Sequence, residues 1–385
     1  MSELSYLEKL LDGVKVEWLP LGNVTKYEQP TKYLVKAKDY HDTFSIPVLT
    51  AGKTFILGYT DETHGIYEAS KTPVIIFDDF TTANKWVDFD FKAKSSAMKM
   101  ITSSDDIKFS LKYVYYWLNT LPNELVDGDH KRQWISNYAQ KKVPVPCPDN
   151  PEKSLAIQSE IVRILDKFTA LTAELTAELT AELTMRKKQY NYYRDQLLSF
   201  KEGEVEWKTL GEVATFRRGT AITQKQTTPG DIPVVANGPT PTYFHSESNR
   251  QDETIVIARS GAYAGYVSFW NQPIFLTDAF SVHPNLKIVK PKFLYYVLQN
   301  KQEHIQAMKK GAGVPHVRVK EFESYDVPIP PLAEQVRIVT ILDKFDTLTN
   351  SITEGLPHEI ELRQKQYEYY RDMLFSFPKP DVVEA

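Results

Sequence analysis

Apolar side chains recur at steps of three and four residues along two stretches of the chain, residues 161–200 and 338–377. This spacing is the period of an α-helix with one apolar stripe. The stretches are copies of one another, because equivalent residues are always 177 positions apart, as Ile161 and Ile338 are. The matching pairs are Ile161/Ile338, Ile164/Ile341, Leu165/Leu342, Phe168/Phe345, Leu171/Leu348, Leu175/Ile352, Tyr190/Tyr367, Tyr193/Tyr370 and Leu197/Leu374.

Two amphipathic helices of equal length can bury their apolar stripes against each other. At about 1.5 Å per residue, each would be a rod of roughly 60 Å. The first copy contains TAELTAELTAEL, residues 172–183, which consists mainly of strong helix formers. Helical filler is an alternative interpretation of this repeat, but the second copy keeps the same length. The second copy also contains Gly355 and Pro357, which predict a bend or a break in that helix.

The segments that precede these helices also repeat. The pairs of matching anchors are residues 16–18 and 205–207, 46–49 and 232–235, 112–116 and 292–296, and 143–146 and 327–330. The sequences between the anchors have little in common, so the chain repeats as two divergent globular halves.

Each globular half combines strand and helix signals. Runs of β-branched residues at 74–77 and 254–257 predict strands. Aromatic side chains at helical spacing predict helices at 109–119 and 291–300. Proline-containing segments at 143–151 and 327–331 are interpreted as stiff connectors into the long helices. Residues 4–13 resemble the end of the first long helix, which suggests that they pack beside the end of the second.

Composition limits the classes of protein to consider. A length of 385 residues suggests two to three domains. The single cysteine, Cys147, excludes an intrachain disulfide. We expect a soluble, cytoplasmic protein, because there is no signal-peptide pattern and no apolar run approaches the roughly 20 residues that span a membrane. The net charge of −4 indicates that any surface for a polyanion is local.

Motifs typical of catalysis are absent or incomplete. Gly52-Lys53-Thr54 imitates the end of a phosphate-binding loop, but Pro47 occupies the position of the first required glycine. Asp90-Phe91-Lys92, preceded by Asp78 and Asp79, imitates a nuclease core but has no counterpart in the second half. The His and Cys residues lack metal-ligand spacing, and no Asn-Pro-Pro-Tyr or Asp-Pro-Pro-Tyr motif of an amino-methyltransferase occurs. The sequence therefore predicts a protein that binds but is not itself an enzyme.

Basic, amide and aromatic side chains gather in loop-like stretches of both halves. Lysine and arginine neutralise phosphates, while Arg, Asn and Gln can form paired hydrogen bonds with base edges. A solvated surface is the alternative interpretation of each cluster, and their presence in both halves disfavours it. The candidate DNA-binding residues are Lys131, Arg132, Gln133, Lys141, Lys142, Arg217, Arg218, Asn237, Arg259, Lys309, Lys310, His316 and Arg318.

The repeated motifs carry a family resemblance over essentially the whole chain. ILDKF with RKKQYNYYRD returns as ILDKF with RQKQYEYYRD, and PIPPLAEQ, residues 328–335, opens the second helix. In the first half that entry is the looser PVPCPDNPEKSLAIQ, residues 144–158. The chain resembles the specificity subunit of type I restriction-modification enzymes, in particular the subclass with TAEL repeats in the central helix.

The resemblance implies an α+β fold with an internal pseudo-two-fold repeat: two mixed α/β target-recognition domains separated by two long helices that form an antiparallel coiled coil. Each domain would read one half of a bipartite double-stranded DNA site, and the helices would set the distance between the halves. The implied divisions are residues 1–14, an N-terminal helix near the end of the distal helix; 15–151, recognition domain 1; 152–201, the central helix; 202–332, recognition domain 2; 333–377, the distal helix; and 378–385, a tail.

The resemblance also implies partners. Two modification subunits would dock on the helices and methylate adenine with S-adenosylmethionine, and restriction subunits would use ATP and Mg²⁺; this chain would hold no cofactor. Two other classes stay open: a coiled-coil scaffold that binds two protein partners without DNA, and a self-contained DNA methyltransferase or nuclease.

Overall fold

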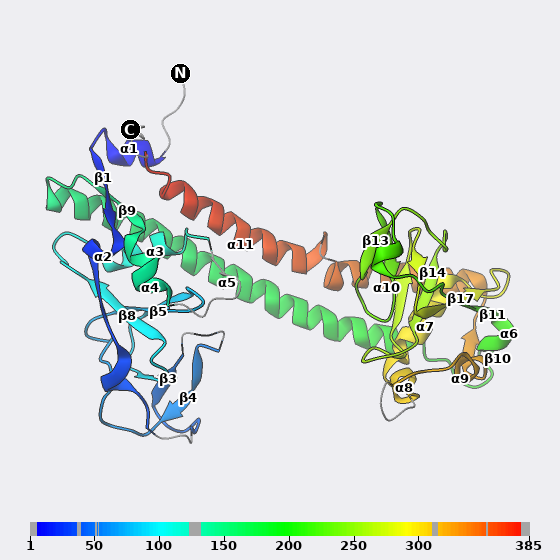
Figure 1. The fold of residues 1–385 in the computed structure, drawn as a ribbon. Coiled ribbons are helices and arrows are strands. Elements are labelled where there is room, and N and C mark those ends of the chain that lie inside the picture. The colour runs from blue at the N-terminus through cyan, green and yellow to red at the C-terminus, as the bar shows by residue number, and fades with distance from the viewer. Residues whose placement is uncertain are drawn as a thin grey trace. The chain divides into compact units, whose positions relative to one another are not determined.

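The chain divides into two compact units in the computed structural model, which describes residues 6–36, 40–50, 52, 54–122, 132–309, 315–351 and 353–378. Unit 1 comprises Met1–Ala177 and Glu361–Ala385, and unit 2 comprises Glu178–Ile360. Each unit therefore combines one globular half with a part of both helical copies (Figure 1).

Unit 1 consists of short strands, short helices and parts of the two long helical stretches. In chain order its elements are α1 (Tyr6–Leu11), β1 (Val16–Pro20), α2 (Leu21–Val24), β2 (Thr25–Glu28), η1 (Pro30–Tyr33), β3 (Ile46–Leu49), β4 (Ile56–Thr60), β5 (Val74–Asp78), β6 (Asn84–Val87), β7 (Lys92–Ala93), β8 (Met98–Ser103), α3 (Leu111–Leu118), α4 (Gln133–Ser136), η2 (Tyr138–Gln140), β9 (Lys142–Pro146), the first part of α5 (Pro151–Leu197) and the last part of α11 (Gly355–Leu374).

Unit 2 also consists of short strands and helices, and its strands pair in the same order as the equivalent strands of unit 1. Its elements are the last part of α5, β10 (Glu206–Thr209), α6 (Leu210–Val213), β11 (Ala214–Arg218), η3 (Gln224–Gln226), β12 (Ile232–Val235), β13 (Tyr243–His245), β14 (Thr254–Ala258), β15 (Val267–Trp270), β16 (Phe275–Leu276), β17 (Ala279–Pro284), α7 (Pro291–Asn300), α8 (Gln302–Ala307), α9 (Val319–Glu323), β18 (Asp326–Ile329), α10 (Leu332–Asn350) and the start of α11.

Three small sheets recur in each unit. A four-stranded antiparallel sheet has the order β2-β8-β5-β6 in unit 1 and β11-β17-β14-β15 in unit 2. A three-stranded sheet (β4-β3-β7 or β13-β12-β16) and a two-stranded ribbon (β1-β9 or β10-β18) complete the set. The inner strands β5 and β14 are buried throughout, as expected for runs of β-branched residues. The predicted strands, the internal repeat and the α+β fold class are confirmed.

The proline-rich segments differ from the prediction. They are not only connectors, because they form strands β9 and β18 of the two-stranded ribbons. In the β1–β9 ribbon, the odd-numbered residues of β9 and its flanks form the backbone hydrogen bonds with β1. Thus Leu21 N donates to Lys141 O, and Cys147 N donates to Lys15 O. Pro144 lies between, opposite Trp18, at a position that donates nothing to the partner strand. Proline is therefore tolerated in an edge strand of this register.

The aromatic helices α3 and α7, both predicted, connect the globular halves to the long helices. Tyr116 Oη donates a hydrogen bond of 2.6 Å to Asp166 on α5. Tyr296 Oη donates one of 2.5 Å to Asp343 on α10. Asp343 is the copy of Asp166, so the same contact fixes each globular half to its own helix.

Buried glutamines add a second repeated contact. Gln158 accepts a hydrogen bond from Ser110 N (2.9 Å) and donates to Lys108 O (3.0 Å). Its copy, Gln335, accepts from Lys290 N (2.8 Å) and donates to Ile288 O and Pro330 O. Both glutamines thus satisfy backbone groups at the start of α3 or α7, where a helix leaves amides without an internal partner. Equivalent residues therefore form the frame of the two units, that is, the contacts that hold each globular half to its long helix.

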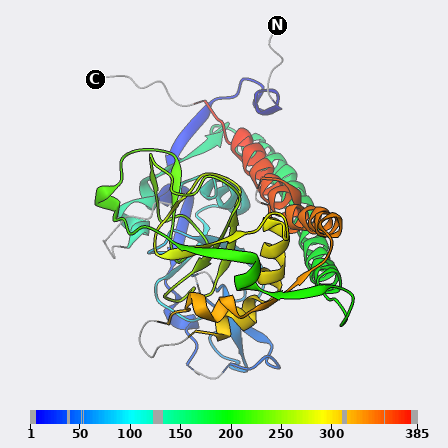
Figure 2. The ribbon, with the colours of Figure 1, turned by 90° about the vertical axis from the view of Figure 1, so that its right-hand side faces the viewer.

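The helical copies pack against each other through reciprocal aromatic contacts. In unit 1, Phe168 on α5 stacks on Tyr370 of α11, with centroids 5.3 Å apart. In unit 2, Phe345 on α10 stacks on Tyr193 of α5, with centroids 5.6 Å apart. Phe345 is the copy of Phe168 and Tyr370 is the copy of Tyr193, so one contact is made twice with the roles exchanged. Both ribbon views show the last part of α11 beside the first part of α5 (Figure 1; Figure 2).

The distal copy is interrupted where glycine and proline predicted it. Helix α10 ends at Asn350 and α11 begins at Gly355, whereas α5 is continuous. Gly355 has φ +80°, and a Cβ there would lie 2.4 Å from Thr347 O. Only glycine fits this turn, because it combines left-handed backbone with close approach to a carbonyl. Ile352, the predicted partner of Leu175 in the repeat, lies outside the described residues.

Each unit has its own apolar core. The core of unit 1 includes Leu7 and Leu11 of α1 together with Leu374 and Phe375 at the end of α11. The largest cluster in unit 2 includes Tyr190, Ile338 and residues of the sheet around β14. Among the helices that the structure describes, none combines the length and the apolar composition required to cross a bilayer.

Candidate nucleic-acid interface

Polar side chains gather at one edge of the four-stranded sheet in unit 2, the edge formed by the end of β14 and the start of β17. Strand β14 ends at Ala258 and β17 begins at Ala279, and these two residues are paired. Arg259 and Asp278 therefore leave the sheet next to each other. Asn237 comes shortly after β12, whose last residue accepts a hydrogen bond from Thr277 N. The strand register thus brings together side chains that are far apart in the sequence.

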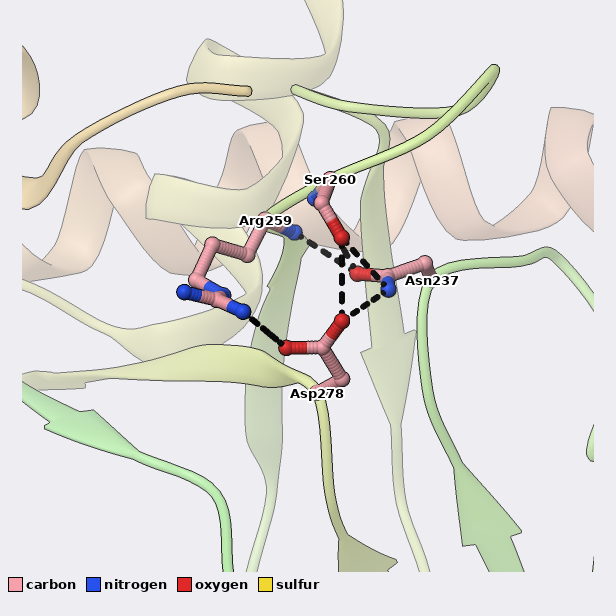
Figure 3. A network of polar contacts seen from close by, with 4 residues as sticks. All are labelled: Asn237, Arg259, Ser260 and Asp278. Atoms are coloured by element: carbon pink, nitrogen blue, oxygen red, sulfur yellow. Dashed lines mark hydrogen bonds and ion pairs between the residues drawn. The ribbon is translucent and has the colours of Figure 1, made fainter. Parts of the chain in front are cut away.

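The carboxylate of Asp278 is the centre of a four-residue network (Figure 3). Its Oδ1 accepts hydrogen bonds from Arg259 Nε (2.9 Å) and Nη2 (2.6 Å). Its Oδ2 accepts from Asn237 Nδ2 (2.6 Å) and Ser260 Oγ (2.9 Å). The side chains of Arg259 and Asp278 are 38% and 41% exposed, so the network is open to a ligand.

Hydrogen bonds decide the charge of Asp278 and the orientation of Asn237. Burial by itself raises the pKa of Asp278, but the bonds from Asn237, Ser260 and Arg259 outweigh it, and the pKa is lowered. Asn237 Oδ1 accepts from the backbone N–H groups of Arg259 (3.0 Å) and Ser260 (3.2 Å). Because an amide oxygen cannot donate, these bonds fix which end of the Asn237 side chain faces Asp278.

A second segment lies beside this network. Gly261 N donates to Pro315 O and Val317 N donates to Arg259 O, and Ser260 forms a β-bridge with His316. Lys309 Nζ donates to Ala262 O at 3.0 Å. The structure therefore brings the predicted residues Asn237, Arg259, Lys309 and His316 together. Arg318 is exposed just before α9, and Lys310 lies outside the described residues.

Arg217 and Arg218 are exposed at the end of β11, the outer strand of the same sheet. Arg218 is paired with Phe280 of β17, so it lies at the same sheet edge as Asp278. Arg217 precedes Arg218 in β11, so its side chain is on the opposite face of the sheet from that of Arg218. On that face, burial lowers the pKa of His283, and the charges of Arg217 and Arg250 lower it further. Arg250 itself is used internally, donating to Ser281 Oγ and to the carbonyl of Arg218.

The equivalent edge of unit 1 has different chemistry. Asp78 of β5 pairs with Met98 of β8 as Ala258 pairs with Ala279, so Asp79 takes the place of Arg259. Asp79 is fully buried, and its Oδ2 lies 3.3 Å from Lys99 Nζ in an ion pair without hydrogen-bond geometry. An internal carboxylate thus occupies the position from which unit 2 presents a guanidinium.

The predicted residues of unit 1 lie around this carboxylate and along the adjoining ribbon. Arg132 Nη1 is 3.7 Å from Asp79 Oδ2, and its side chain is 50% exposed. Gln133 is only 7% exposed, which leaves little of its amide for a base edge. Lys141 lies over the ring of Tyr138, Lys142 is exposed at the start of β9, and Lys131 lies outside the described residues.

Sequence reasoning missed the residues that form the polar networks beside Arg132 and Arg259. Asp278, Ser260, Asp79 and Lys99 were not among the candidates, although Asp278 and Asp79 directly adjoin predicted or observed strand ends. A search for side chains that attract phosphate passes over carboxylates. Strand ends that carry an acid in one half and an arginine in the other were the available signal.

The residues that imitated catalytic sites are used structurally. Asp90 accepts hydrogen bonds from Ser70 N and Oγ, and Lys92 is buried in an ion pair with Glu62 at 2.8 Å. Asp79, the upstream acid of the imitated nuclease core, forms an ion pair with Lys99. Within the described ranges, no group of three or more His, Cys, Asp or Glu side chains is arranged to hold a metal ion.

The chain is similar to proteins of one kind over its whole length. The model of the "Type I restriction modification DNA specificity domain" matches residues 14–185 and 202–362. The type I restriction enzyme EcoR124I/EcoR124II specificity subunit of Escherichia coli is 63% identical, with all of both chains covered. The EcoprrI specificity subunit of Escherichia coli is 37% identical over 92% of this chain and 93% of its own.

Solved structures share the fold. The S subunit of a type I restriction-modification system from M. genitalium superposes with a TM-score of 0.57 at 18% identity, covering 96% of this chain and 98% of that one. A chain from a structure on complex assembly and conformational transition of the type I R-M system superposes with a TM-score of 0.60 at 16% identity, covering 94% and 97%. At such identities the likeness concerns the fold alone.

Proposed function

The chain belongs to the family of type I restriction-modification DNA specificity proteins, and we propose that it directs adenine methylation and restriction by reading a split DNA site, one part through each globular domain. It performs no chemistry itself. We keep residues 15–151 and 202–332 as the two recognition domains. The paired helices set the distance between the two parts of the site and dock the methyltransferase subunits.

One observation carries this proposal: the frame repeats while the sheet edges differ. Tyr116 and Tyr296 make the same contact with the long helices, as Gln158 and Gln335 do with the first turns of α3 and α7. The corresponding strand ends carry buried Asp79 in one unit and exposed Arg259 in the other. A constant frame with divergent edges is what two readers of different base sequences require.

The helical copies also provide surface for partners. Tyr192 and its copy Tyr369 are 59% and 66% exposed within the repeated QYNYYRD and QYEYYRD motifs. Exposed aromatic side chains are enriched at protein interfaces. We assign these positions to two modification subunits, which bring S-adenosylmethionine, while restriction subunits bring ATP and Mg²⁺. We place the chain in the cytoplasm because DNA is its proposed ligand.

Exchange of one domain tests the function. Residues 205–330 are replaced by the matching segment of a relative, and the methylated sites are mapped in cells that also express the modification subunits. We expect one part of the split site to change while the other part and the spacer persist, because each unit has its own core. Wild-type chain in the same cells is the control.

Two outcomes contradict the proposal. Simultaneous change of both parts of the site would show that the domains do not read DNA independently. Absence of any split methylated site with the wild-type chain would remove the specificity function itself, since the partners are present.

Lys141 and Lys142 provide a separate test of DNA contact. Their replacement by alanine should weaken binding to all sequences and reduce the slope of log affinity against log salt by about one unit per lost phosphate contact. Binding of the assembled complex to labelled duplexes at several salt concentrations measures this slope. Lys71→Ala, at an exposed lysine paired with Glu68, is the matched control. An unchanged slope in the double variant removes both lysines from the interface.

A further inference from the structure

We propose that Arg259 reads a guanine in the part of the DNA site that unit 2 recognises, and that Asp278 and Asn237 are its positioning residues. The inference rests on the proposed function and names the base and the side chains that reach it. It follows from the geometry of the network in Figure 3 and from the exposure of its arginine.

The donors of Arg259 are divided between the protein and the solvent side. A guanidinium has five N–H donors in a planar fork. Asp278 Oδ1 uses one on Nε and one on Nη2. Among the described residues, Nη1 makes no hydrogen bond or ion pair, and the second hydrogen of Nη2 points away from the carboxylate. The end of the fork, with one hydrogen from each Nη, is therefore presented outward.

Guanine is the base that matches this presentation. In the major groove it shows two adjacent acceptors, N7 and O6, and paired contact with arginine is the commonest specific contact there. Adenine offers one acceptor and one donor, so it suits an amide better than a fork of donors. An arginine held on one side by a carboxylate keeps its plane fixed and so aims its fork at one base.

The network around Asp278 is rigid and charged. Both carboxylate oxygens accept two hydrogen bonds, and the lowered pKa keeps the group ionised. Asn237 is itself fixed by the backbone amides of Arg259 and Ser260. The side chain of Arg259 therefore loses less freedom on binding than a lone surface arginine does.

We assign the neighbouring cations to phosphate contacts, which position the protein on the duplex without reading bases. Arg218 lies at the same sheet edge, and Lys309 is held against Ala262 beside the network. Unit 1 has Asp79, buried, at the position of Arg259. Unit 1 therefore has no equivalent of the Arg259 contact at this position.

The test is to map the methylated site for the full chain and its variants, each coexpressed with the modification subunits. Arg259→Ala and Arg259→Lys should both relax one guanine position, since lysine keeps the charge but not the fork. Asp278→Asn should relax the same position, because it keeps the shape but weakens the hold on the guanidinium. Arg218→Ala is the control and should weaken binding to all sequences without relaxing any base.

The expected size is set by a paired contact. Discrimination against the other bases at that position, measured by competition between duplexes, should fall by roughly 5-fold to 140-fold, since such contacts are worth about 1–3 kcal/mol and 1.4 kcal/mol is tenfold. The other bases of the site, including those read by unit 1, should stay specified. Thermal unfolding of each purified variant checks that the fold is kept.

Several results overturn the inference. Arg259 variants that keep every base specified remove Arg259 from base reading. Relaxation at an A·T position indicates insertion into a narrow minor groove instead of guanine contact. Loss of all methylation in Arg259→Ala, Arg259→Lys and Asp278→Asn, with lowered Tm, assigns the network to folding. A wild-type chain that gives no split site is a different result, because it contradicts the proposed function.

Discussion

Replacing Gln335 by leucine is expected to lower the free energy of unfolding of unit 2 by about 3–5 kcal/mol. Gln335 is fully buried and bonds three backbone groups: Lys290 N (2.8 Å), Ile288 O (3.0 Å) and Pro330 O (2.8 Å). Leucine has a similar volume but leaves these groups without this partner, and each unsatisfied buried group costs about 1–3 kcal/mol. Urea unfolding followed by tryptophan fluorescence measures the change.

A matched control separates the buried contact from the loss of a glutamine. Gln364 is exposed on α11 and donates to Glu368 one turn away, so Gln364→Leu should change the stability by less than about 0.5 kcal/mol. Equal stability of the two variants would show that the backbone around α7 does not depend on Gln335. Gln158→Leu should destabilise unit 1 in the same way, because Gln158 bonds Ser110 N and Lys108 O as Gln335 bonds Lys290 N and Ile288 O.

Deletion of one TAEL unit, residues 172–175, is expected to shorten the spacer of the recognised site by roughly one to two base pairs. Four helical residues correspond to about 6 Å of rise and about 40° of rotation relative to whole turns, and duplex DNA rises about 3.4 Å per base pair. Helix α5 is continuous here, and Phe168 and Tyr193 lie on either side of the deletion. The deleted residues lie in α5, outside both proposed recognition domains, so both parts of the site should remain the same.

The measurement is a map of methylated sites made with the modification subunits present. Replacement of residues 172–175 by four alanines keeps the length of α5 and is the control, which should keep the spacer. The distal copy stays full length, and its interruption between Asn350 and Gly355 can take up the mismatch. An active deletion variant with an unchanged spacer would show that the helices do not set the distance.

The sequence was informative wherever structure is local or repeated. Helical periodicity predicted the long helices, and Gly355 with Pro357 predicted the interruption, because backbone restrictions act within a few residues. The strands β9 and β18 were not predicted, because their existence depends on Trp18 and Trp207 in distant segments. A proline read alone indicates a connector. The same proline in a ribbon whose hydrogen bonds fall on alternate residues is compatible with a strand.

The candidate site was predictable only in part, for a similar reason. Asn237 and Arg259 were found because both were placed at likely loop ends, Asn237 after the repeated anchor 232–235 and Arg259 after the predicted strand 254–257. Their association depends on the register of β14 with β17 and on Asp278, which no local pattern connects to them. Gln133 carries the opposite lesson. An amide beside basic residues suggested an exposed reader, but the Gln133 N–H donates to Asp79 O and its side chain is buried.

The reciprocal stacking of Phe168 on Tyr370 and of Phe345 on Tyr193 has a genetic consequence. Each helical copy supplies one phenylalanine and one tyrosine at the same two positions, so the DNA segments that encode the copies are interchangeable at this contact. A crossover within either segment regenerates both stacks. Homologous recombination there can deliver a new globular domain without disturbing the helices that receive it, and new combinations of DNA sites can arise in a single step.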